Sequence, residues 1–191
     1  MGILILSDTH GLVREVKETV ERHAAEKVFH CGDFCVDRKR DPFADMILVR
    51  GNCDVDRDVP EEQLTEWKDL KILQTHGHLF GVKSSLMRLH YRAEETGANV
   101  VLFGHSHVPV CGVERGILFL NPGSLQLPRS FDVPTYAYLE QLETRKREVR
   151  VQVTYFDHHG NPVERLGGSF PCAADFLKNG EYVLYLNGYN G

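Results

Sequence analysis

The sequence has no long hydrophobic run. Its apolar segments, such as ILILS near the start and NVVLFG in the middle, give way to polar residues after a few positions. A helix that spans a bilayer needs about 20 consecutive apolar residues, so we expect no membrane association. The first residues also lack the pattern of a secretory signal, which predicts a cytoplasmic protein.

An excess of basic residues is also missing. The chain has 22 lysines and arginines against 27 aspartates and glutamates, which gives a formal net charge of −5. Such a chain has no general attraction for the phosphate backbone of nucleic acid or for an anionic membrane. We therefore expect no extended nucleic-acid binding, and a phosphate-bearing substrate would need a local positive centre.

Cysteines are few, and their pattern does not indicate a disulfide framework. They are scattered along the chain, and their number is odd. The five are Cys31, Cys35, Cys53, Cys111 and Cys172. Cys31 and Cys35 flank Asp33, and we interpret them as one core thiol and one loop thiol rather than as a metal-binding pair.

Short apolar runs, each followed by a polar loop, dominate the first half of the chain. They are Ile3–Leu6, Lys27–His30, Met46–Val49, Lys71–Gln74 and Asn99–Phe103. Each has the length of a strand and shows neither a helical period nor alternation, as is typical of strands buried on both faces. Val13, Val16 and Val20 mark one face of a helix, and Leu86–Glu95 is a second helix candidate. Strands alternating with helices predict an α/β domain.

The second half of the chain has the pattern of hairpins. A Glu-Arg-Gly turn separates two apolar runs in VCGVERGILFLNPGS, and a charged turn separates two alternating segments in PTYAYLEQLETRKREVRVQVTYF. We expect these hairpins to form a second, more antiparallel sheet. Residues 1–170 are predicted to be a single domain, and residues 171–191 a C-terminal tail of uncertain structure to which we assign no function.

Metal-binding side chains follow each of the five apolar runs. In open α/β sheets ligands bind outside the carboxyl ends of the strands, so the loops after these runs can converge on one site. Taken singly, each motif also fits a turn, a helix cap or a surface histidine. Together, carboxylates, imidazoles and an amide without paired thiolates favour divalent Mn, Fe, Co or Zn over a structural zinc knuckle. The side chains are Asp8, His10, Asp33, Asn52, His76, His78, His105 and His107.

The motifs SDTHG, CGDF, RGNCD, THGH and GHSH occur in this order. They resemble the metal-binding blocks of the calcineurin-like metallophosphoesterase superfamily. The HGHLFGVK and NPGS segments are most similar to the small single-domain phosphodiesterases of its YfcE/MJ0936-like branch. The resemblance covers roughly residues 1–156. It implies the metallophosphoesterase fold, a four-layer α/β/β/α sandwich of two mixed sheets flanked by helices.

The resemblance also implies a centre of two divalent metal ions. One ion would be held by Asp8, His10, Asp33 and His107, and the other by Asp33, Asn52, His76 and His105, with Asp33 shared. Manganese is the expected metal, with nickel, cobalt, iron or zinc as alternatives. Two ions about 3.5–4 Å apart can share a hydroxide that attacks phosphorus, while His105 stabilises the developing charge. Asp8 and His10, two residues apart on an extended chain, are expected to point to the same side, and His78 lies outside the implied ligand set.

One position departs from the superfamily pattern. Most members have a histidine after the asparagine, which protonates the leaving group or steadies the transition state, and this chain has Cys53. Asp54 keeps the superfamily's carboxylate but has no histidine to orient. A thiol with an ordinary pKa of about 8.5 is a poor general acid, so we expect a preference for good leaving groups, such as those of aryl phosphodiesters. His105, Asp54 and Cys53 are the candidate catalytic residues.

Two further segments have less specific patterns. Arg38 or Arg40 in DRKRD could contact a substrate phosphate or belong to a solvated loop. The turn NPGS is expected to pack beneath the GHSH loop, where Asn121 could hydrogen-bond a metal ligand.

The sequence favours a metal-dependent phosphodiesterase that acts on small phosphodiesters. Alternatives among enzymes are a phosphomonoesterase and a nuclease for short strands. An alternative of another class is a non-catalytic protein-interaction scaffold, because the retromer subunit with this fold resembles the same family. All implied ligand positions are filled in this chain, which favours catalysis. Assembly into a homo-oligomer is left open.

Overall fold

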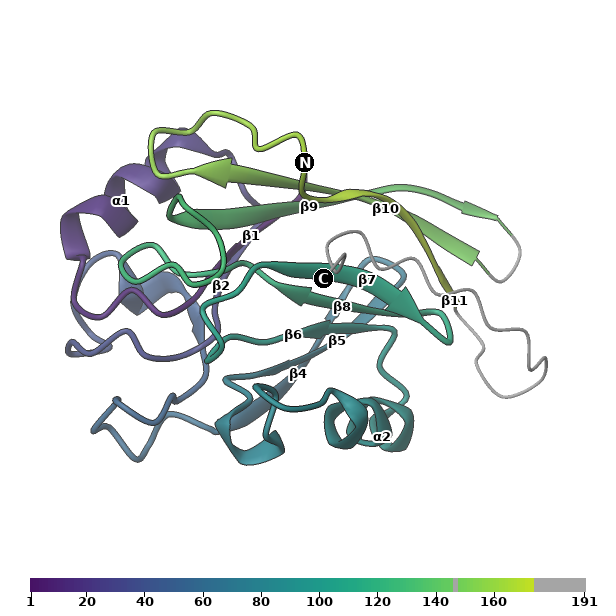
Figure 1. The fold of residues 1–191 in the computed structure, drawn as a ribbon, viewed down its shortest axis with the longest axis horizontal. Helices are drawn as coiled ribbons and strands as arrows, with labels where there is room; N and C mark the ends of the chain where they lie inside the picture. Colours follow the sequence, from purple (N-terminus) through teal and green to yellow (C-terminus); the bar gives the residue numbers. More distant parts are fainter. Residues whose placement is uncertain (146–147, 174–191) are drawn as a thin grey trace.

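The computed structural model describes residues 1–145 and 148–173, and Figure 1 shows how their helices and strands are arranged. The two α-helices of this part are α1 (Val13–Arg22) and α2 (Met87–Thr96). Its strands are β1 (Ile3–Leu6), β2 (Lys27–His30), β3 (Ile47–Leu48), β4 (Glu62–Trp67), β5 (Leu70–Thr75), β6 (Val100–Leu102), β7 (Val110–Glu114), β8 (Ile117–Asn121), β9 (Thr135–Arg145), β10 (Glu148–Asp157) and β11 (Gly168–Ala173). Short 3₁₀ turns occur at Phe43–Asp45 and His78–Phe80.

The strands form two mixed sheets. The first has the strand order β11-β10-β9-β1-β2-β3, and the second has the order β4-β5-β6-β8-β7. Each contains a parallel core, made of β1, β2 and β3 in the first sheet and of β5, β6 and β8 in the second. All five apolar runs of the first half are strands of these cores, and the predicted α/β class is confirmed.

The hairpins of the second half do not form a sheet of their own, and that prediction is wrong. β7 and β8 pair with each other and extend the second sheet beside β6. β9 and β10 also pair with each other, and β9 joins the first sheet through an antiparallel contact with β1. Each parallel core leaves open edges whose N–H and C=O groups need partners. The hairpins satisfy edges in both sheets, which makes both sheets mixed.

Alternate residues of one strand belong to different layers of the molecule. Ile3 and Ile5 lie in the core between the two sheets. Leu4 packs instead with Val16 of α1 on the outer face of the first sheet, and Leu89 of α2 packs on the outer face of the second sheet. The two helices thus cover opposite sides (Figure 1), which confirms the four-layer α/β/β/α sandwich. Burial of both faces explains why the core strands show no alternation of apolar and polar residues.

The sequence patterns did not predict strand β4. β4 pairs with β5 at the edge of the second sheet and is partly exposed, so its sequence EQLTEW lacks an apolar run. β11 continues to Ala173, past the predicted boundary at residue 170. The predicted charged turn at residues 146–147 and residues 174–191 of the predicted tail lie outside the described residues.

All five cysteines are free thiols, as their scattered pattern predicts. Within residues 1–145 and 148–173, no helix has the length and apolar character needed to cross a membrane.

Candidate metal centre

The loops that follow β1, β2 and β3 of the first sheet meet those that follow β5 and β6 of the second. The N–H of Asp8 donates to the carbonyl of Gly32 at 3.0 Å, and the N–H of Gly104 donates to that of His76 at 3.1 Å. The two sheets are joined at this point because the N–H of His105 donates to Asp8 Oδ2 at 3.0 Å. All seven predicted ligands lie in these loops: Asp8, His10, Asp33, Asn52, His76, His105 and His107.

The backbone at most of these residues is not extended, which corrects the expectation for Asp8 and His10. Their φ angles are 52° and 42°, in the left-handed region. Asp33, His105 and His107 share this conformation, with φ angles of 55°, 65° and 60°. Non-glycine residues adopt it only where the surroundings hold them. The curl of the loops, rather than strand alternation, therefore brings Asp8 and His10 together.

A first group of ligand atoms comes from Asp8, His10 and His107, and these atoms lie within 4.8 Å of one another. His107 Nε2 is 3.1 Å from Asp8 Oδ1, and the rings of His10 and His107 are 5.3 Å apart. His10 Nε2 is buried and has no hydrogen-bond partner among the described residues. The geometry is that of three ligands around one position.

A second group comes from Asp8, Asp33 and His76, again within 4.8 Å. His76 Nε2 lies 3.4 Å from Asp33 Oδ2 and 3.1 Å from Asn52 Oδ1. The ring of His105 packs edge-on against that of His76 at 5.0 Å. The carboxylate common to both groups is that of Asp8, whereas the sequence prediction gives the shared position to Asp33.

The protons of His76 and His107 can be assigned from their partners. His76 Nδ1 is 2.7 Å from the carbonyl of Cys31, and His107 Nδ1 is 2.8 Å from that of Leu127. A carbonyl only accepts, so in both rings Nδ1 carries the hydrogen, and Nε2 of the neutral ring presents a lone pair. Both lone pairs face the carboxylates, which also only accept. A cation at their meeting point would satisfy all these groups, so the residues fit divalent metal ions.

The charges of the cluster also indicate that it needs positive charge. Burial opposes charge on Asp8 and Asp33, but hydrogen bonds and charge interactions with His107 and His76 outweigh it and lower both carboxyl pKa values. For His76, burial is likewise outweighed by Asp33 and Asp8, so the imidazole pKa is raised. The hydrogen bond to Asp8 raises the pKa of His107 in the same way. Each partner is stabilised by opposite charge, which protons or metal ions can supply.

His105 and His78 differ from these two histidines. Burial, together with the positive charges of His76 and Lys83, lowers the pKa of His105 to about 4. Burial followed by the charge of His76 also lowers the pKa of His78. The ring of His78 lies 5.4 Å from that of His76. His78 thus stands beside the cluster, and its side chain is partly buried rather than solvated.

Residues around the cluster fix the orientation of Asp8. Ser7 Oγ donates to Asp8 Oδ2 at 2.6 Å, and Ser124 Oγ donates to the Asp8 carbonyl at 2.7 Å. A Cβ at Gly104 would lie 1.9 Å from Ser7 Oγ, so only glycine fits there. Sequence reasoning missed Ser7 and Ser124, although Ser124 lies in the NPGS turn that it had selected.

Asn121 of the same turn supports the GHSH loop. Its Nδ2 donates to the carbonyl of Gly104 at 2.9 Å and to Ser106 Oγ at 3.0 Å. The turn therefore packs beneath the loop, as predicted. Its partners are the backbone and a serine, however, and not a predicted ligand side chain.

Asp54 connects the loops after β2 and β3. Its carboxylate accepts the N–H groups of Asp33 and Cys35 at 2.8 Å each and of Gly51 at 2.7 Å. Asp33 Oδ1 in turn accepts the N–H of Cys53 at 2.8 Å. The structure thus gives Asp54 a set of partners that the sequence did not reveal, because all of them are backbone groups.

The thiol of Cys53 lies at the edge of the cluster and is exposed. Ligand atoms of His10, Cys35 and Cys53 lie within 4.8 Å of one another, and Cys35 Sγ is 3.6 Å from His10 Nδ1. Burial and the charge of Asp33 raise the pKa of Cys53 to about 11. Cys31 is buried and Cys35 is exposed, as predicted, but the neighbour of Cys35 is His10.

Arg38 has an acidic partner on the adjacent loop. Its Nε lies 2.9 Å from Asp56 Oδ2, and its Nη2 lies 3.8 Å from Asp58 Oδ2. The side chain is thus engaged in a partly exposed ion pair, which agrees with the interpretation of DRKRD as a loop surface.

A two-sheet sandwich with a carboxylate and histidine cluster at its strand ends defines the class of the metallophosphoesterases. The model of the calcineurin-like phosphoesterase superfamily domain matches residues 1–144. The chain belongs to this family.

Individual relatives agree with this assignment. The chain is 43% identical over 168 residues to a probable metallophosphoesterase, YsnB, of Bacillus subtilis, covering 87% of this chain and 96% of the relative. It is 30% identical over 172 residues to the phosphodiesterase MJ0936 of Methanocaldococcus jannaschii, covering 78% and 97%. A solved structure of a predicted phosphoesterase from Streptococcus pneumoniae superimposes with a TM-score of 0.80 at 34% identity, covering 88% and 96%.

Proposed function

We propose that this protein is a phosphodiesterase that uses two divalent metal ions to hydrolyse small phosphodiesters. The observation that carries the proposal is the orientation of His76 and His107, whose Nε2 atoms face the carboxylates of Asp33 and Asp8. Family membership supports phosphoesterase chemistry. The name of the Methanocaldococcus relative supports diesters as the substrate class.

In the proposed centre the seven predicted ligands would hold the two ions, with Asp33 as the shared ligand that the resemblance implies and Asp8 close to both groups. When bound, the ions lower the pKa of a water molecule towards about 7 and neutralise charge on the phosphoryl oxygens. His105, with a pKa of about 4, is neutral at pH 7, so it could offer a lone pair to an ion or donate its ring N–H to a phosphoryl oxygen. Hydrogen bonds from Ser7 Oγ and the His105 N–H to Asp8 Oδ2 hold the Asp8 carboxylate in its orientation.

Cys53 and Asp54 complete the proposed set. The Cys53 thiol, with a pKa of about 11, keeps its proton at pH 7 and is a weak acid for the leaving oxygen. Asp54 acts by positioning the loops that present Asp33 and Cys53, since its carboxylate is occupied by backbone N–H groups. Reaction with alkyl esters is therefore slower than with aryl esters, whose leaving groups need no proton.

Manganese is the proposed metal, and nickel, cobalt, iron and zinc suit the same oxygen and nitrogen ligands. A small substrate is proposed because a chain with a net charge of −5 has no excess of basic residues to bind a long phosphate backbone. A cytoplasmic site of action is part of the same proposal. The scaffold alternative has less support, because a protein-interaction surface does not require a complete set of ligands directed at one point.

An activity screen tests this function. The full chain would be assayed with bis(4-nitrophenyl) phosphate, 4-nitrophenyl phosphate, cyclic nucleotides and a short oligonucleotide, each with Mn, Ni, Co, Zn and Mg. We expect metal-dependent hydrolysis that is fastest for the aryl diester and is lost in Asp33→Ala. Asp45→Ala is the matched control, because Asp45 lies in the 3₁₀ turn after Pro42 and outside the cluster.

Two results would contradict the proposal. One is an Asp33→Ala variant that has the same melting temperature and the same activity as the wild type. Asp33 would then not be a shared metal ligand. Hydrolysis of the monoester or of the oligonucleotide in preference to the diester would favour the corresponding alternative enzyme.

A further inference from the structure

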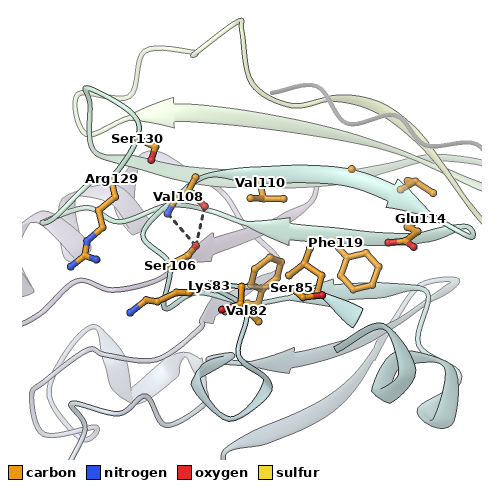
Figure 2. Close-up of a pocket in the computed structure, with 15 residues that line it drawn as sticks. Val82, Lys83, Ser85, Ser106, Val108, Val110, Glu114, Phe119, Arg129 and Ser130 are labelled. Atoms are coloured by element: carbon orange, nitrogen blue, oxygen red, sulfur yellow. Dashed lines mark hydrogen bonds between the residues drawn. The ribbon is translucent and has the colours of Figure 1, made fainter. Parts of the chain in front are cut away.

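A cavity of about 480 Å³ opens beside the metal centre. It lies between β7, β8 and the loops at residues 82–86, 106–108 and 129–130 (Figure 2). Its volume is within the range of small-molecule sites, about 300–1,000 Å³. None of the residues discussed above as ligands lines it, so its contents would not be metal ions.

The cavity and the metal centre are contiguous. Ser106, which lines the cavity, stands in the chain between His105 and His107. Arg129, another lining residue, donates its backbone N–H to the carbonyl of His107 at 3.1 Å. The side-chain charges of Lys83 and Arg129 act on the rings of His105 and His107, respectively. A phosphoryl group at the metal centre would therefore lie near the part of the cavity that Ser106, Lys83 and Arg129 line.

The charge and polarity of the lining side chains change from one end of the cavity to the other. Figure 2 shows Lys83 and Arg129 at one end and Glu114 at the other. Between them lie apolar side chains, including Phe119 and Val110, and the hydroxyl of Ser106. Cations thus stand at the end nearest the metal centre, an aromatic and aliphatic wall follows, and a carboxylate stands at the far end.

We propose that this cavity binds the organic group of the phosphodiester and selects an aromatic group, while Lys83 and Arg129 contact the phosphoryl oxygens. The inference rests on the proposed phosphodiesterase function and specifies its substrate class. A flat ring matches the Phe119 wall, and ring N–H or amino groups can donate to Glu114. A plain alkyl chain lacks the ring-on-ring contact with Phe119 and loses more rotamer freedom on binding.

Binding of single-group ligands tests the proposal without relying on turnover. Methylphosphonate, hexylphosphonate and phenylphosphonate would be titrated into the manganese-loaded full chain by calorimetry. They share one anionic head and differ in one organic group. We expect phenylphosphonate to bind about 10- to 100-fold more tightly than methylphosphonate, the gain expected for burial of one ring, and more tightly than hexylphosphonate.

Three variants test whether the preference for phenylphosphonate arises in this cavity. Ser84 lines the cavity and is exposed, so Ser84→Trp should fill the cavity without disturbing the core and should remove the preference for phenyl. Lys83→Ala should weaken all three phosphonates alike. Arg88→Ala removes the same charge from an exposed position of α2 that does not line the cavity, and it should keep both the affinities and the preference.

The outcomes separate this inference from the proposed function. Equal affinity for phenylphosphonate and methylphosphonate, in a protein that hydrolyses phosphodiesters, would overturn the inference alone. A preference for hexyl over phenyl would also overturn it in favour of an aliphatic substrate. Absence of hydrolysis for every diester and metal would contradict the proposed function, whatever the phosphonates show.

Discussion

At Cys53 the chain places a thiol among negative charges where most relatives of its superfamily are expected to carry an imidazole. The side chain is exposed, and burial and Asp33 raise its pKa to about 11. An imidazole has an ordinary pKa near 6.5 and gives up its proton far more readily. In the proposed mechanism, the identity of this residue therefore sets how much the reaction depends on the leaving group.

Leaving-group dependence gives a direct prediction for Cys53. In the wild type, kcat for a series of aryl phosphodiesters should fall steeply as the pKa of the leaving phenol rises, because little protonation assists departure. Cys53→His should make the decrease shallower, with the largest gain, about 10- to 100-fold, for the poorest leaving group. Cys35→Ser is the control, since it changes the neighbouring thiol. Parallel plots for wild type and Cys53→His would refute this role.

Single residues were also the level at which the sequence was most informative. The candidate ligands could be selected because metal-binding side chains follow each buried strand in a familiar order of motifs, and the structure brings them to one place. The left-handed backbone at Asp8 and His105 could not be predicted, because it depends on contacts between loops. For the same reason the sequence did not single out Lys83 and Arg129, which only the fold brings beside His105 and His107.

At the scale of elements, the parallel strands support the loops at their carboxyl ends, and these loops carry the candidate metal ligands. The strands were predictable because runs such as ILIL are apolar throughout. The partners of the hairpins were not, because pairing of β9 with β1 joins segments more than a hundred residues apart. The position of each loop then depends on bonds such as those of Asp54, which fasten the β2 loop to the β3 loop.

Substitution of Asp54 should loosen these loops. Asp54→Asn replaces an acceptor that serves three backbone donors, so at least one N–H loses its partner. We expect manganese affinity to fall about 10- to 100-fold, as for other residues that support metal ligands. Calorimetric titration measures this, and circular dichroism checks the fold. Asp58→Asn, at an exposed loop carboxylate, should change little. Equal losses in both variants would indicate a general charge effect and not positioning.

At the scale of the whole molecule, the two sheets enclose titratable groups next to the metal centre. His30, at the end of β2, is fully buried, and its Nε2 lies 2.9 Å from Thr9 Oγ1. Burial lowers its pKa from 6.5 to about 3. In the unfolded chain His30 takes up a proton below pH 6.5, whereas in the folded chain it does so only near pH 3.

Because of His30, the protein should become less stable as the pH is lowered. Between pH 6.5 and 3 the unfolded state binds the extra proton, so the free energy of unfolding decreases as pH falls, by at most about 1.4 kcal/mol per pH unit from this group. Urea unfolding from pH 7.5 to 4.5, with chelator present, measures the slope. His30→Gln should show a shallower slope even if it is less stable at pH 7.5. Identical slopes in the two proteins would contradict the assignment.

The central claim is that the cluster around Asp8, Asp33 and His76 is a dinuclear metal centre. The most direct measurement is elemental analysis of the full chain after loading with manganese and removal of free metal. The account predicts about two ions per chain, a marked loss in Asp8→Ala, and no loss in Asp45→Ala. A wild-type chain that retains no more than a trace of manganese, nickel, cobalt, iron or zinc would contradict it.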